Sequence, residues 1–360
     1  MGATFPRGRY NSSLGDTTLT GLGLADLTSR LGSRARALAV RRFLFETRPW
    51  PAVLPTHLPG VNAKAWEALR ESAPLPDWTL ADRIEAPDGT TKLALGLGST
   101  TVETVLIPSD GRTTVCVSSQ AGCTQHCRFC ATATLGFTRQ LTAGEIVLQY
   151  AVARAEAAPA APARNVVFMG MGEPMDNLDA VLAAIRVLTE EAAPRLSWSH
   201  VTVSTSGVLP GMKRFLAESR AHLALSLNAT TDEQRERLMP QNRQWPIAAL
   251  LGALRDDQAR GSGRRYFIEY VLWDGVNDTD DDARRLVGLL AGLPAHVNLI
   301  PHNPFAGSPL RPPAEERVLA FQTRVHDGGV RCLVRWPRGR EIAAACGQLA
   351  LRRMERPDGP

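Results

Sequence analysis

Three cysteines with short spacing are the residues of this chain whose types most clearly suggest chemistry. Cys123, Cys127 and Cys130 lie in the segment GCTQHCRFC, with the spacing C-x3-C-x2-C. Thiolates this close together bind zinc or an iron–sulfur cluster, and a structural metal site normally has four protein ligands. Three ligands without a neighbouring fourth leave one metal position open. A cluster with an open iron can bind S-adenosylmethionine and reduce it, which releases a 5′-deoxyadenosyl radical.

Other interpretations of this loop stay open when only its residues are considered. His126 or a distant residue could complete a zinc knuckle, although His126 lies between two of the cysteines and would be cramped as a ligand. Two of the thiols could instead form a redox pair, or all three could be buried free cysteines.

Polar residues and glycines follow four segments that have the composition of buried strands. NVVFMGMGEP ends in a turn, where Gly172 lets the backbone approach a ligand and Glu173 offers an acceptor to an amino group. The segments HVTVSTSG, LALSLNA and NLIPHNPF supply the remaining candidates, which are Ser204, Ser226, Leu227, Asn228 and Asn303. A tight turn, a helix cap or an Asn-Pro turn explains each feature equally well by itself. Their repetition at successive strand ends favours a binding site.

Strands and helices are expected to alternate after the cysteine loop. Short apolar segments predict strands at 165–169, 200–205, 223–227, 266–272 and 296–300. Helices are predicted between them at 142–157, 178–189, 211–218, 247–260, 280–290 and 314–326. Continuous apolar strands joined by helices indicate a parallel sheet covered by helices. We therefore expect an α/β fold, a partial (β/α)6 barrel whose site lies at the C-terminal ends of the strands.

Four regions are expected along the chain. Residues 1–78 form a helical appendage of a kind that could bind RNA, and 79–112 form a β-rich connector. Residues 113–336 form the partial barrel, and 337–360 form a C-terminal segment that carries Cys346.

Basic residues concentrate towards the two ends of the chain. The formal net charge is +5, and residues 1–80 carry ten Arg or Lys against six Asp or Glu. Helical periodicity in this region places Val40 on the apolar face and Arg34, Arg41 and Arg42 largely on the other. These charges are compatible with a phosphate-bearing partner and equally with a solvated, arginine-rich surface.

Composition suggests a protein of the reducing cytoplasm without a membrane anchor. The chain has 360 residues, 44% of them hydrophobic, which is enough for a large core. No apolar run approaches the roughly 18 residues of a membrane span. The first residues lack the apolar stretch of a secretory signal, so export is not expected. Six cysteines in such a compartment suggest chemistry before a disulfide scaffold.

Three further cysteines lie outside the triplet. Cys116 precedes it, and Cys346 follows far along the chain between Ala345 and Gly347, small neighbours that would let another group approach its thiol. A flexible tail could bring Cys346 to the cluster. The alternative for an isolated cysteine is a small buried hydrophobe, and Cys332 has no other evident role.

Several longer motifs together resemble a known family. CVSSQAGCTQHCRFCATATLGFTRQLTAGEI, NVVFMGMGEPMDNLDAV, VTVSTSGVLPGM, FIEYVLWDGVND, VNLIPHNPF and AACGQL are similar, in order and separation, to the RlmN/Cfr family of radical SAM RNA methyltransferases, more so to its RlmN side. The resemblance covers about 101–349. Asn228 stands where that family's pattern usually has histidine, and Trp336 replaces part of a more usual basic stretch.

The resemblance implies a reaction that uses two S-adenosylmethionine molecules per turnover and one 4Fe–4S cluster on Cys123, Cys127 and Cys130. One S-adenosylmethionine would methylate Cys346, and a radical made from the second would activate that methyl group for addition to an adenine ring carbon. Cys116 would then form a transient disulfide with Cys346 to release the product.

Further expectations follow from the same resemblance. Glu103 matches the family's proton acceptor, and the S-adenosylmethionine contacts carry over to Gly172, Glu173, Ser204, Ser226, Leu227, Asn228 and Asn303. Carbon 2 of an adenosine in 23S rRNA is the leading target, with tRNA as a second substrate. A flavodoxin or ferredoxin would donate electrons to a monomeric, cytoplasmic enzyme.

Two alternatives belong to other functional classes. A radical SAM enzyme acting on a different RNA, a peptide or a small molecule needs the triplet but not this basic surface. A non-catalytic zinc or iron–sulfur module that binds RNA needs only the triplet and the charges.

Overall fold

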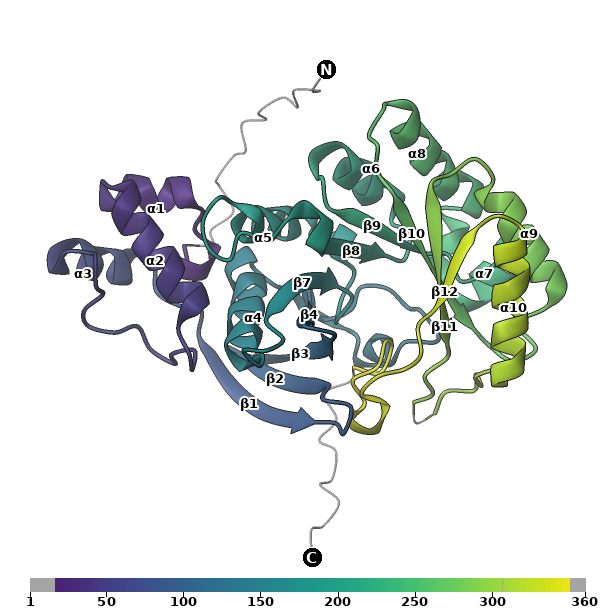
Figure 1. The fold of residues 1–360 in the computed structure, drawn as a ribbon, viewed down its shortest axis with the longest axis horizontal. Helices are drawn as coiled ribbons and strands as arrows, with labels where there is room; N and C mark the ends of the chain where they lie inside the picture. The colour runs from purple at the N-terminus through teal and green to yellow at the C-terminus, as the bar shows by residue number, and fades with distance from the viewer. Residues whose placement is uncertain (1–16, 306, 350–360) are drawn as a thin grey trace, which may run out of the picture.

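A single ten-stranded sheet organises the molecule (Figure 1). The computed structural model describes residues 17–305 and 307–349. The strand order is β1-β2-β3-β4-β7-β8-β9-β10-β11-β12. Its first part is antiparallel and consists of β1 (Trp78–Glu85), β2 (Thr91–Leu97) and β3 (Thr100–Ser109), which pairs with β4 (Arg112–Cys116).

The remaining strands are parallel and confirm the expected partial barrel. From β4 the sheet continues through β7 (Ala163–Phe168), β8 (Val201–Thr205), β9 (His222–Ser226), β10 (Tyr266–Leu272), β11 (Ala295–Pro301) and β12 (Arg331–Val334). The crossover helices are α4 (Ala143–Glu156), α5 (Leu178–Thr189), α6 (Leu209–Glu218), α8 (Ile247–Ala259), α9 (Asp280–Leu290) and α10 (Glu315–Asp327). Since β1 and β12 are the two edges of the sheet, the barrel stays open.

Alternation along the parallel strands separates the core from the interior of the barrel. In β10, Ile268 and Tyr270 are fully buried, and Tyr270 stacks on Phe321 of the helix layer. Glu269 and Val271 alternate with them and line a cavity inside the barrel. Successive side chains of a strand point to opposite faces, so the same strand supplies both the hydrophobic core and polar residues for a site.

Three helices form a unit at the N-terminal end of the described chain, beside α4 and α5 (Figure 1). They are α1 (Leu24–Leu31), α2 (Arg34–Glu46) and α3 (Ala63–Ser72). The expected solvent-facing position of Arg41 is wrong, because its side chain is fully buried. Arg41 Nε donates to the carbonyl of Ala193 at 2.9 Å, and Nη2 donates to the carbonyl of Val187. Arg41 therefore attaches the helical unit to the barrel, while Arg34 and Arg42 are exposed as expected.

Several short elements were not expected from the sequence. β5 (Gln120–Gly122) and β6 (Phe137–Gln140) form a separate two-stranded sheet around the cysteine loop, and α7 (Asp232–Leu238) follows β9. The last strand, β12, is likewise too short to give a periodic signal. Single 3₁₀ turns complete the structure at Leu19–Gly21, Ala131–Leu135, Pro174–Asn177, Trp198–His200, Pro240–Arg243 and Arg340–Ile342.

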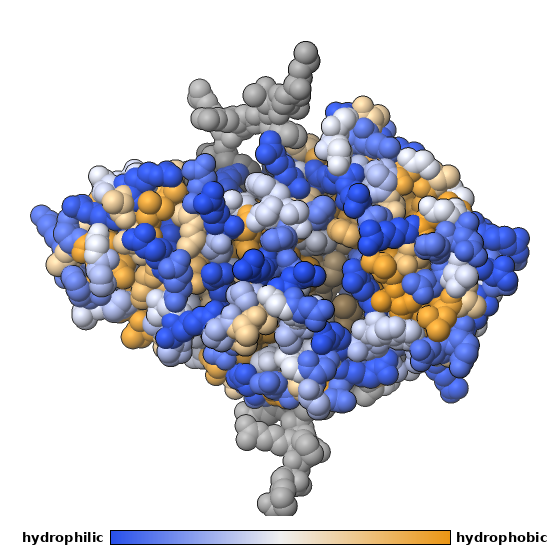
Figure 2. All heavy atoms as spheres, in the orientation of Figure 1, coloured by the Kyte–Doolittle hydropathy of each residue, from blue (hydrophilic) through white to orange (hydrophobic). Residues whose placement is uncertain are grey.

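Hydrophilic side chains cover most of the face seen in Figure 2. Within the described ranges, no helix has the length and apolar composition needed to cross a bilayer. Parts of two expected regions, residues 1–16 and 350–360, lie outside the described residues.

Candidate active site

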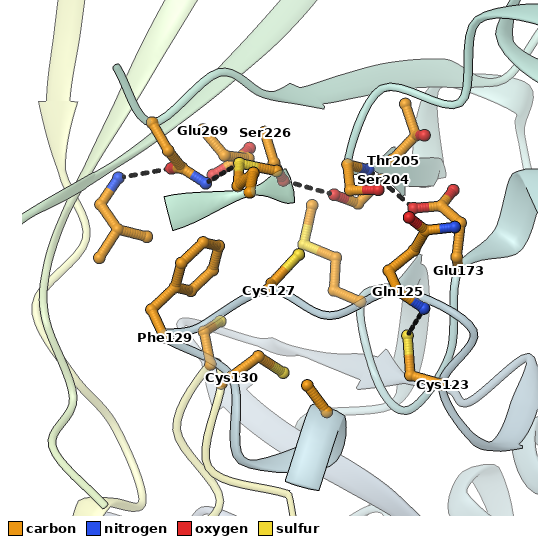
Figure 3. Close-up of a pocket in the computed structure, with 18 of the residues that line it drawn as sticks. Cys123, Gln125, Cys127, Phe129, Cys130, Glu173, Ser204, Thr205, Ser226 and Glu269 are labelled. Carbon is orange, nitrogen blue, oxygen red and sulfur yellow. Dashed lines mark hydrogen bonds between the residues drawn. The ribbon is translucent and has the colours of Figure 1, made fainter. Parts of the chain in front are cut away.

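A cavity of about 170 Å³ lies inside the barrel, at the C-terminal ends of the parallel strands. Figure 3 shows Cys127, Phe129 and Cys130 on one side of it and Ser204, Ser226 and Glu269 on the other. Ten of the residues expected from the sequence line this cavity: Cys123, Cys127, Cys130, Gly172, Glu173, Ser204, Ser226, Asn228, Asn303 and Cys346. Leu227, Cys116 and Glu103 are not among the lining residues.

The small sheet of β5 and β6 holds the cysteine loop against the barrel. Gly122 has φ +78°, and a Cβ there would lie 1.9 Å from the carbonyl oxygen of Gly136, so the two ends of the loop meet only with glycine at this position. The backbone N–H of Cys123 donates to that same carbonyl at 3.0 Å. Phe129 packs on Trp273, which follows β10, with ring centroids 5.1 Å apart.

The environment of Cys123 and Cys127 disfavours free thiolates. Burial raises the pKa of Cys123 to about 12, and burial together with the neighbouring charge of Cys130 raises that of Cys127 further. Two donors approach the sulfurs, the backbone N–H of Gln125 at 3.4 Å from Cys123 Sγ and Nε2 of Gln241 at 3.7 Å from Cys127 Sγ. Such donors stabilise a thiolate once a metal holds it. Within the described chain, no three His, Cys, Asp or Glu side chains are close enough to hold a single metal ion.

The turn after β7 brings backbone and a buried carboxylate to the cavity wall. Gly172 has φ +100°, and a Cβ there would lie 2.5 Å from the Cβ of Gln120. Glu173 is 3% exposed, and its carboxylate accepts from the backbone N–H of Met175 at 3.0 Å and of Ser206 at 2.8 Å. Burial raises the pKa of Glu173, and these hydrogen bonds oppose that effect.

The ends of β8 and β9 present hydroxyl groups to the cavity. Ser204 Oγ and Ser226 Oγ lie 3.5 Å apart and share a hydrogen bond. Asn228 follows in the left-handed conformation, with φ +61°, which asparagine tolerates better than most residues. Its Oδ1 accepts from the backbone N–H of Val271 at 2.9 Å. The departure from the family pattern at Asn228 therefore also has a structural role, since it joins the ends of β9 and β10.

A buried arginine that sequence reasoning missed fixes these strand ends. Arg235 of α7 is fully buried, and burial lowers its pKa to about 10. Its guanidinium donates to the carbonyls of Ser206, Ser226 and Leu227. Leu227, expected to contact S-adenosylmethionine, is buried outside the cavity lining and contributes its backbone to this arrangement.

The segment that carries Cys346 crosses from β12 towards β2 and β3 (Figure 1). We call residues 335–349 the C-terminal crossing. At its start, the backbone N–H of Gly339 donates to Asp88 Oδ2 at 3.1 Å. Lys92 Nζ then donates to the carbonyl of Ala343 at 3.4 Å. These contacts attach the first half of the crossing to the antiparallel strands.

The second half of the crossing is attached to the cysteine loop and to the loop after β11. The backbone N–H of Ala131 donates to the carbonyl of Gly347 at 2.7 Å. Asn303 Nδ2 donates to the carbonyl of Cys346 at 3.2 Å, while Asn303 Oδ1 is buried without a partner in the described structure. Hydrogen bonds on both sides thus hold Cys346 in the cavity wall, rather than on the free tail that the sequence suggested.

Cys346 and Cys116 are brought into electrostatic contact although 230 positions separate them in sequence numbering. The Cys346 side chain is open to the cavity, yet protein surrounds it so closely that burial raises its pKa to about 11. Cys116, at the end of β4, is buried, and burial followed by the Cys346 charge raises its pKa. Both cysteines are thiols at neutral pH. Cys332 is buried in the core on β12, as expected for a thiol without a role.

Glu103 lies in an ion pair beside the cavity rather than in its wall. The Glu103 side chain is 2% exposed, and its Oε1 lies 2.9 Å from Lys92 Nζ. Lys92 also contacts the C-terminal crossing at Ala343. The family resemblance implies a proton acceptor at Glu103, and in the structure Glu103 is the counter-ion of a lysine that touches the segment carrying Cys346.

The comparisons with known proteins agree with this site. The sequence profile of the Radical SAM superfamily matches residues 117–287. A probable RNA methyltransferase of Sorangium cellulosum (strain So ce56) is 48% identical over 350 residues, which cover 93% of this chain and 87% of that protein. Dual-specificity RNA methyltransferase RlmN 2 of Myxococcus xanthus (strain DK1622) is 42% identical, covering 91% of this chain and 87% of that protein. The chain belongs to the RlmN family within the radical SAM superfamily.

A solved structure of the same superfamily has the same fold as this RlmN-family chain. The crystal structure of a radical SAM methyltransferase from Sphaerobacter thermophilus superposes with a TM-score of 0.84 at 40% sequence identity. The match covers 92% of this chain and 98% of that one. Family membership makes this chain a radical SAM methyltransferase, with a 4Fe–4S cluster and S-adenosylmethionine as its cofactors.

The cavity of this RlmN-family member fits those cofactors. Three thiols from one loop supply the soft ligands that an iron–sulfur cluster requires. The carboxylate of Glu173 and the unpartnered Asn303 Oδ1 offer acceptors to a ligand that bears amino and hydroxyl groups. These residues would hold the cluster and S-adenosylmethionine side by side.

Two further lining residues of the family site were missed from the sequence, Glu269 and His302. Burial, and then the charge of Arg340, lower the pKa of His302 to about 4, so this imidazole is neutral. Burial raises the pKa of Glu269 to about 7. The sequence contains one signal that could have identified Glu269 as a site residue. It is the single carboxylate in the apolar strand segment FIEYVL, and charged residues are rarely buried without a partner or a function.

Proposed function

We propose that this enzyme methylates an adenine ring carbon of RNA and that Cys346 carries the methyl group. The proposed target is carbon 2 of an adenosine in 23S rRNA, with an adenosine of tRNA as a second substrate. Support comes from relatives named RNA methyltransferases, including one named dual-specificity in Myxococcus xanthus, which match most of the chain.

One observation carries the proposal. Cys346 lines the same cavity as Cys123, Cys127 and Cys130, although it lies more than 200 positions after them. A radical SAM enzyme that acted directly on its substrate would need no thiol at this place. A thiol there, in electrostatic contact with the second thiol of Cys116, supports a covalent methyl carrier with a partner that resolves it.

The residues of the chain have distinct tasks in this reaction. Cys346 Sγ accepts a methyl group by displacement on S-adenosylmethionine. When bound, the cluster and a second S-adenosylmethionine supply the radical that takes a hydrogen atom from that methyl group. The carbon still attached to Cys346 then adds to the adenine ring, and the adduct loses the proton of that ring carbon to a base and one electron, which would return to the cluster. Cys116 then gives up its proton and attacks Cys346 Sγ. The S–C bond breaks as the disulfide forms, and the released carbon takes up a proton to become the methyl group of the base.

Adenine chemistry supports a radical route. An aromatic ring carbon of adenine is a poor nucleophile, so ordinary displacement on S-adenosylmethionine does not methylate it, whereas a carbon radical can add to it. The protein's contribution is therefore to position the reactants, as the residues that converge on the cavity would do.

We further propose a monomeric, cytoplasmic enzyme that receives electrons from a flavodoxin or ferredoxin. All six cysteines are free thiols in the structure, which suits a reducing compartment.

The test is methyl transfer from labelled S-adenosylmethionine by the anaerobically reconstituted enzyme, given rRNA and tRNA. Cys346→Ala should lose transfer to RNA by at least about 10³-fold, because no other side chain replaces the covalent carrier. Cys332→Ala is the matched control, since it removes a buried thiol outside the cavity and should keep transfer within a few-fold. Undiminished transfer by Cys346→Ala would contradict the proposal, and so would label that enters only a peptide or a small molecule.

A further inference from the structure

Glu269 is a buried carboxylate in the cavity to which no step above gives a role. It lies in the middle of β10, beside Ser226 of β9 and Asn298 of β11 in the sheet register. Its side chain lines the cavity together with Cys346 (Figure 3 labels Glu269). Burying a carboxylate is costly unless it is paired or has a function. Glu269 therefore requires an explanation.

The protein uses only part of the hydrogen-bonding capacity of Glu269. Within residues 17–305 and 307–349, its carboxylate accepts one hydrogen bond, from Asn298 Nδ2 to Oε1 at 2.8 Å. Asn298 is held in turn, because Arg335 Nε donates to its Oδ1 at 3.0 Å. These two hydrogen bonds orient the carboxylate of Glu269. Among the described residues, Arg335 reaches it only through Asn298 and does not form an ion pair with it. The second carboxylate oxygen is left for the cavity.

The charged and titratable groups around Glu269 come from two elements, the C-terminal crossing and α7. Arg335, at the start of the C-terminal crossing, acts on Glu269 through Asn298. Arg235 of α7 donates to the carbonyl of the adjacent Ser226. Cys346 of the crossing is the thiol that Glu269 influences, and the effect of Glu269 on Cys346 is second only to burial. The Glu269 carboxylate and the Cys346 thiol thus line one cavity and influence each other's charge.

We infer that Glu269 is the general base for the methylation of Cys346. As Cys346 Sγ attacks the methyl group, its S–H bond breaks and the proton moves to the free oxygen of Glu269. The new S–C bond forms while the methyl group leaves the sulfonium. The sulfonium sulfur keeps the electron pair and becomes the neutral thioether of S-adenosylhomocysteine. Charge balances, because one cation and one carboxylate are replaced by neutral products.

Physical reasons favour a base here. A thiol is a poor nucleophile until its proton is removed, and Glu269 lines the same cavity as the Cys346 thiol. Glu269 has a pKa of about 7, so its carboxylate is available at neutral pH and can accept a proton readily. Positioned general bases contribute roughly 10²–10⁴-fold to a rate.

The first measurement is a single turnover of Cys346 methylation in the reconstituted holoenzyme, with saturating S-adenosylmethionine and neither RNA nor reductant. Peptide mass spectrometry reports the methyl group on Cys346. Glu269→Gln should slow methylation by about 10²-fold, and Glu269→Asp should recover part of the rate. The wild-type rate should fall as pH drops through about 7, because Glu269 becomes protonated, and the rate of Glu269→Gln should not show this step.

The second measurement separates base catalysis from a simple charge effect. Iodoacetamide alkylates Cys346 by the same kind of displacement and needs no cofactor. The charge of Glu269 raises the pKa of Cys346, so charge alone predicts faster alkylation in Glu269→Gln. A lost base predicts slower alkylation. Cys332, whose pKa is raised by burial alone, is the internal control in the same peptide map.

The inference rests on one part of the proposed function, that Cys346 carries the methyl group. Neither assay contains RNA. Failure of the RNA assignment would leave both results unchanged. Methylation of Glu269→Gln at the wild-type rate, or faster alkylation of its Cys346, would overturn the inference. Loss of S-adenosylmethionine binding in Glu269→Gln would also overturn it, because Glu269 would then be a ligand of the cofactor and not a base.

Discussion

Three buried carboxylates in or near the site differ in the hydrogen bonds and ion pairs that the protein makes to them. Glu173 accepts two backbone hydrogen bonds, Glu103 pairs with Lys92, and Glu269 accepts one side-chain hydrogen bond. A carboxylate that is fully paired positions its neighbours, whereas one with a free oxygen can take part in proton transfer. Glu103 thus supports the C-terminal crossing through Lys92, its expected role as a proton acceptor stays a prediction, and Glu269 is the carboxylate with a free oxygen.

The ion pair of Lys92 and Glu103 gives a prediction at the scale of single residues. Lys92→Met should lower the free energy of unfolding by about 3–5 kcal/mol, because it removes the counter-ion of a buried carboxylate. Urea denaturation of the cluster-free protein measures the change. The double variant Lys92→Met with Glu103→Gln should recover most of the loss. If Glu103→Gln alone abolished methyl transfer without altering stability, Glu103 would be the proton acceptor that the family resemblance implies.

At the scale of elements, the turns after the parallel strands form much of the cavity wall. Gly172→Ala should weaken S-adenosylmethionine binding by at least about 10-fold, because the positive φ and the approach of Gln120 forbid a Cβ without moving the turn. Equilibrium dialysis of the reconstituted protein measures the affinity. Gly111→Ala is the matched control, with φ +66° but open space around the added methyl, and it should leave affinity unchanged. Equal losses of S-adenosylmethionine affinity in both variants would show that the close contact between Gly172 and Gln120 is not the cause.

Sequence patterns could predict the elements and the strand-end residues, but not the partners that lie far apart in the chain. Short apolar strands ending in polar residues placed Ser204, Ser226 and Asn303 at one edge of the sheet, because parallel strands share that edge. Arg41 was placed on the wrong face, since periodicity cannot reveal the carbonyls of a distant helix end that bury a guanidinium. The pairing of Lys92 with the C-terminal crossing spans 251 positions and has no local signal.

At the scale of the whole molecule, the helical unit and the barrel are joined through Arg41, which leaves Arg42 exposed on α2. If this unit contacts RNA, Arg42→Gln should weaken RNA binding and reduce the slope of log affinity against log salt by about 0.7–0.9, as expected for one lost phosphate contact. Fluorescence anisotropy with labelled RNA over a salt series measures both. Arg284→Gln, on the outer helix α9, is the control. If the salt dependence of RNA binding were the same for Arg42→Gln as for the wild type, Arg42 would not contact an RNA phosphate.

In the proposed reaction, the C-terminal crossing would also set the order of events in a turnover. Cys346 is attached on both sides, and its thiol shares one cavity with the cluster ligands and the residues expected to contact S-adenosylmethionine. In the proposed reaction the carrier would thus stay in place while its reaction partners change, so the two S-adenosylmethionine molecules would use the cavity one after the other. S-adenosylhomocysteine from the first would have to leave before the second could bind. Product that lingers in the cavity would therefore delay radical formation, making cellular removal of S-adenosylhomocysteine a control on the rate of RNA methylation.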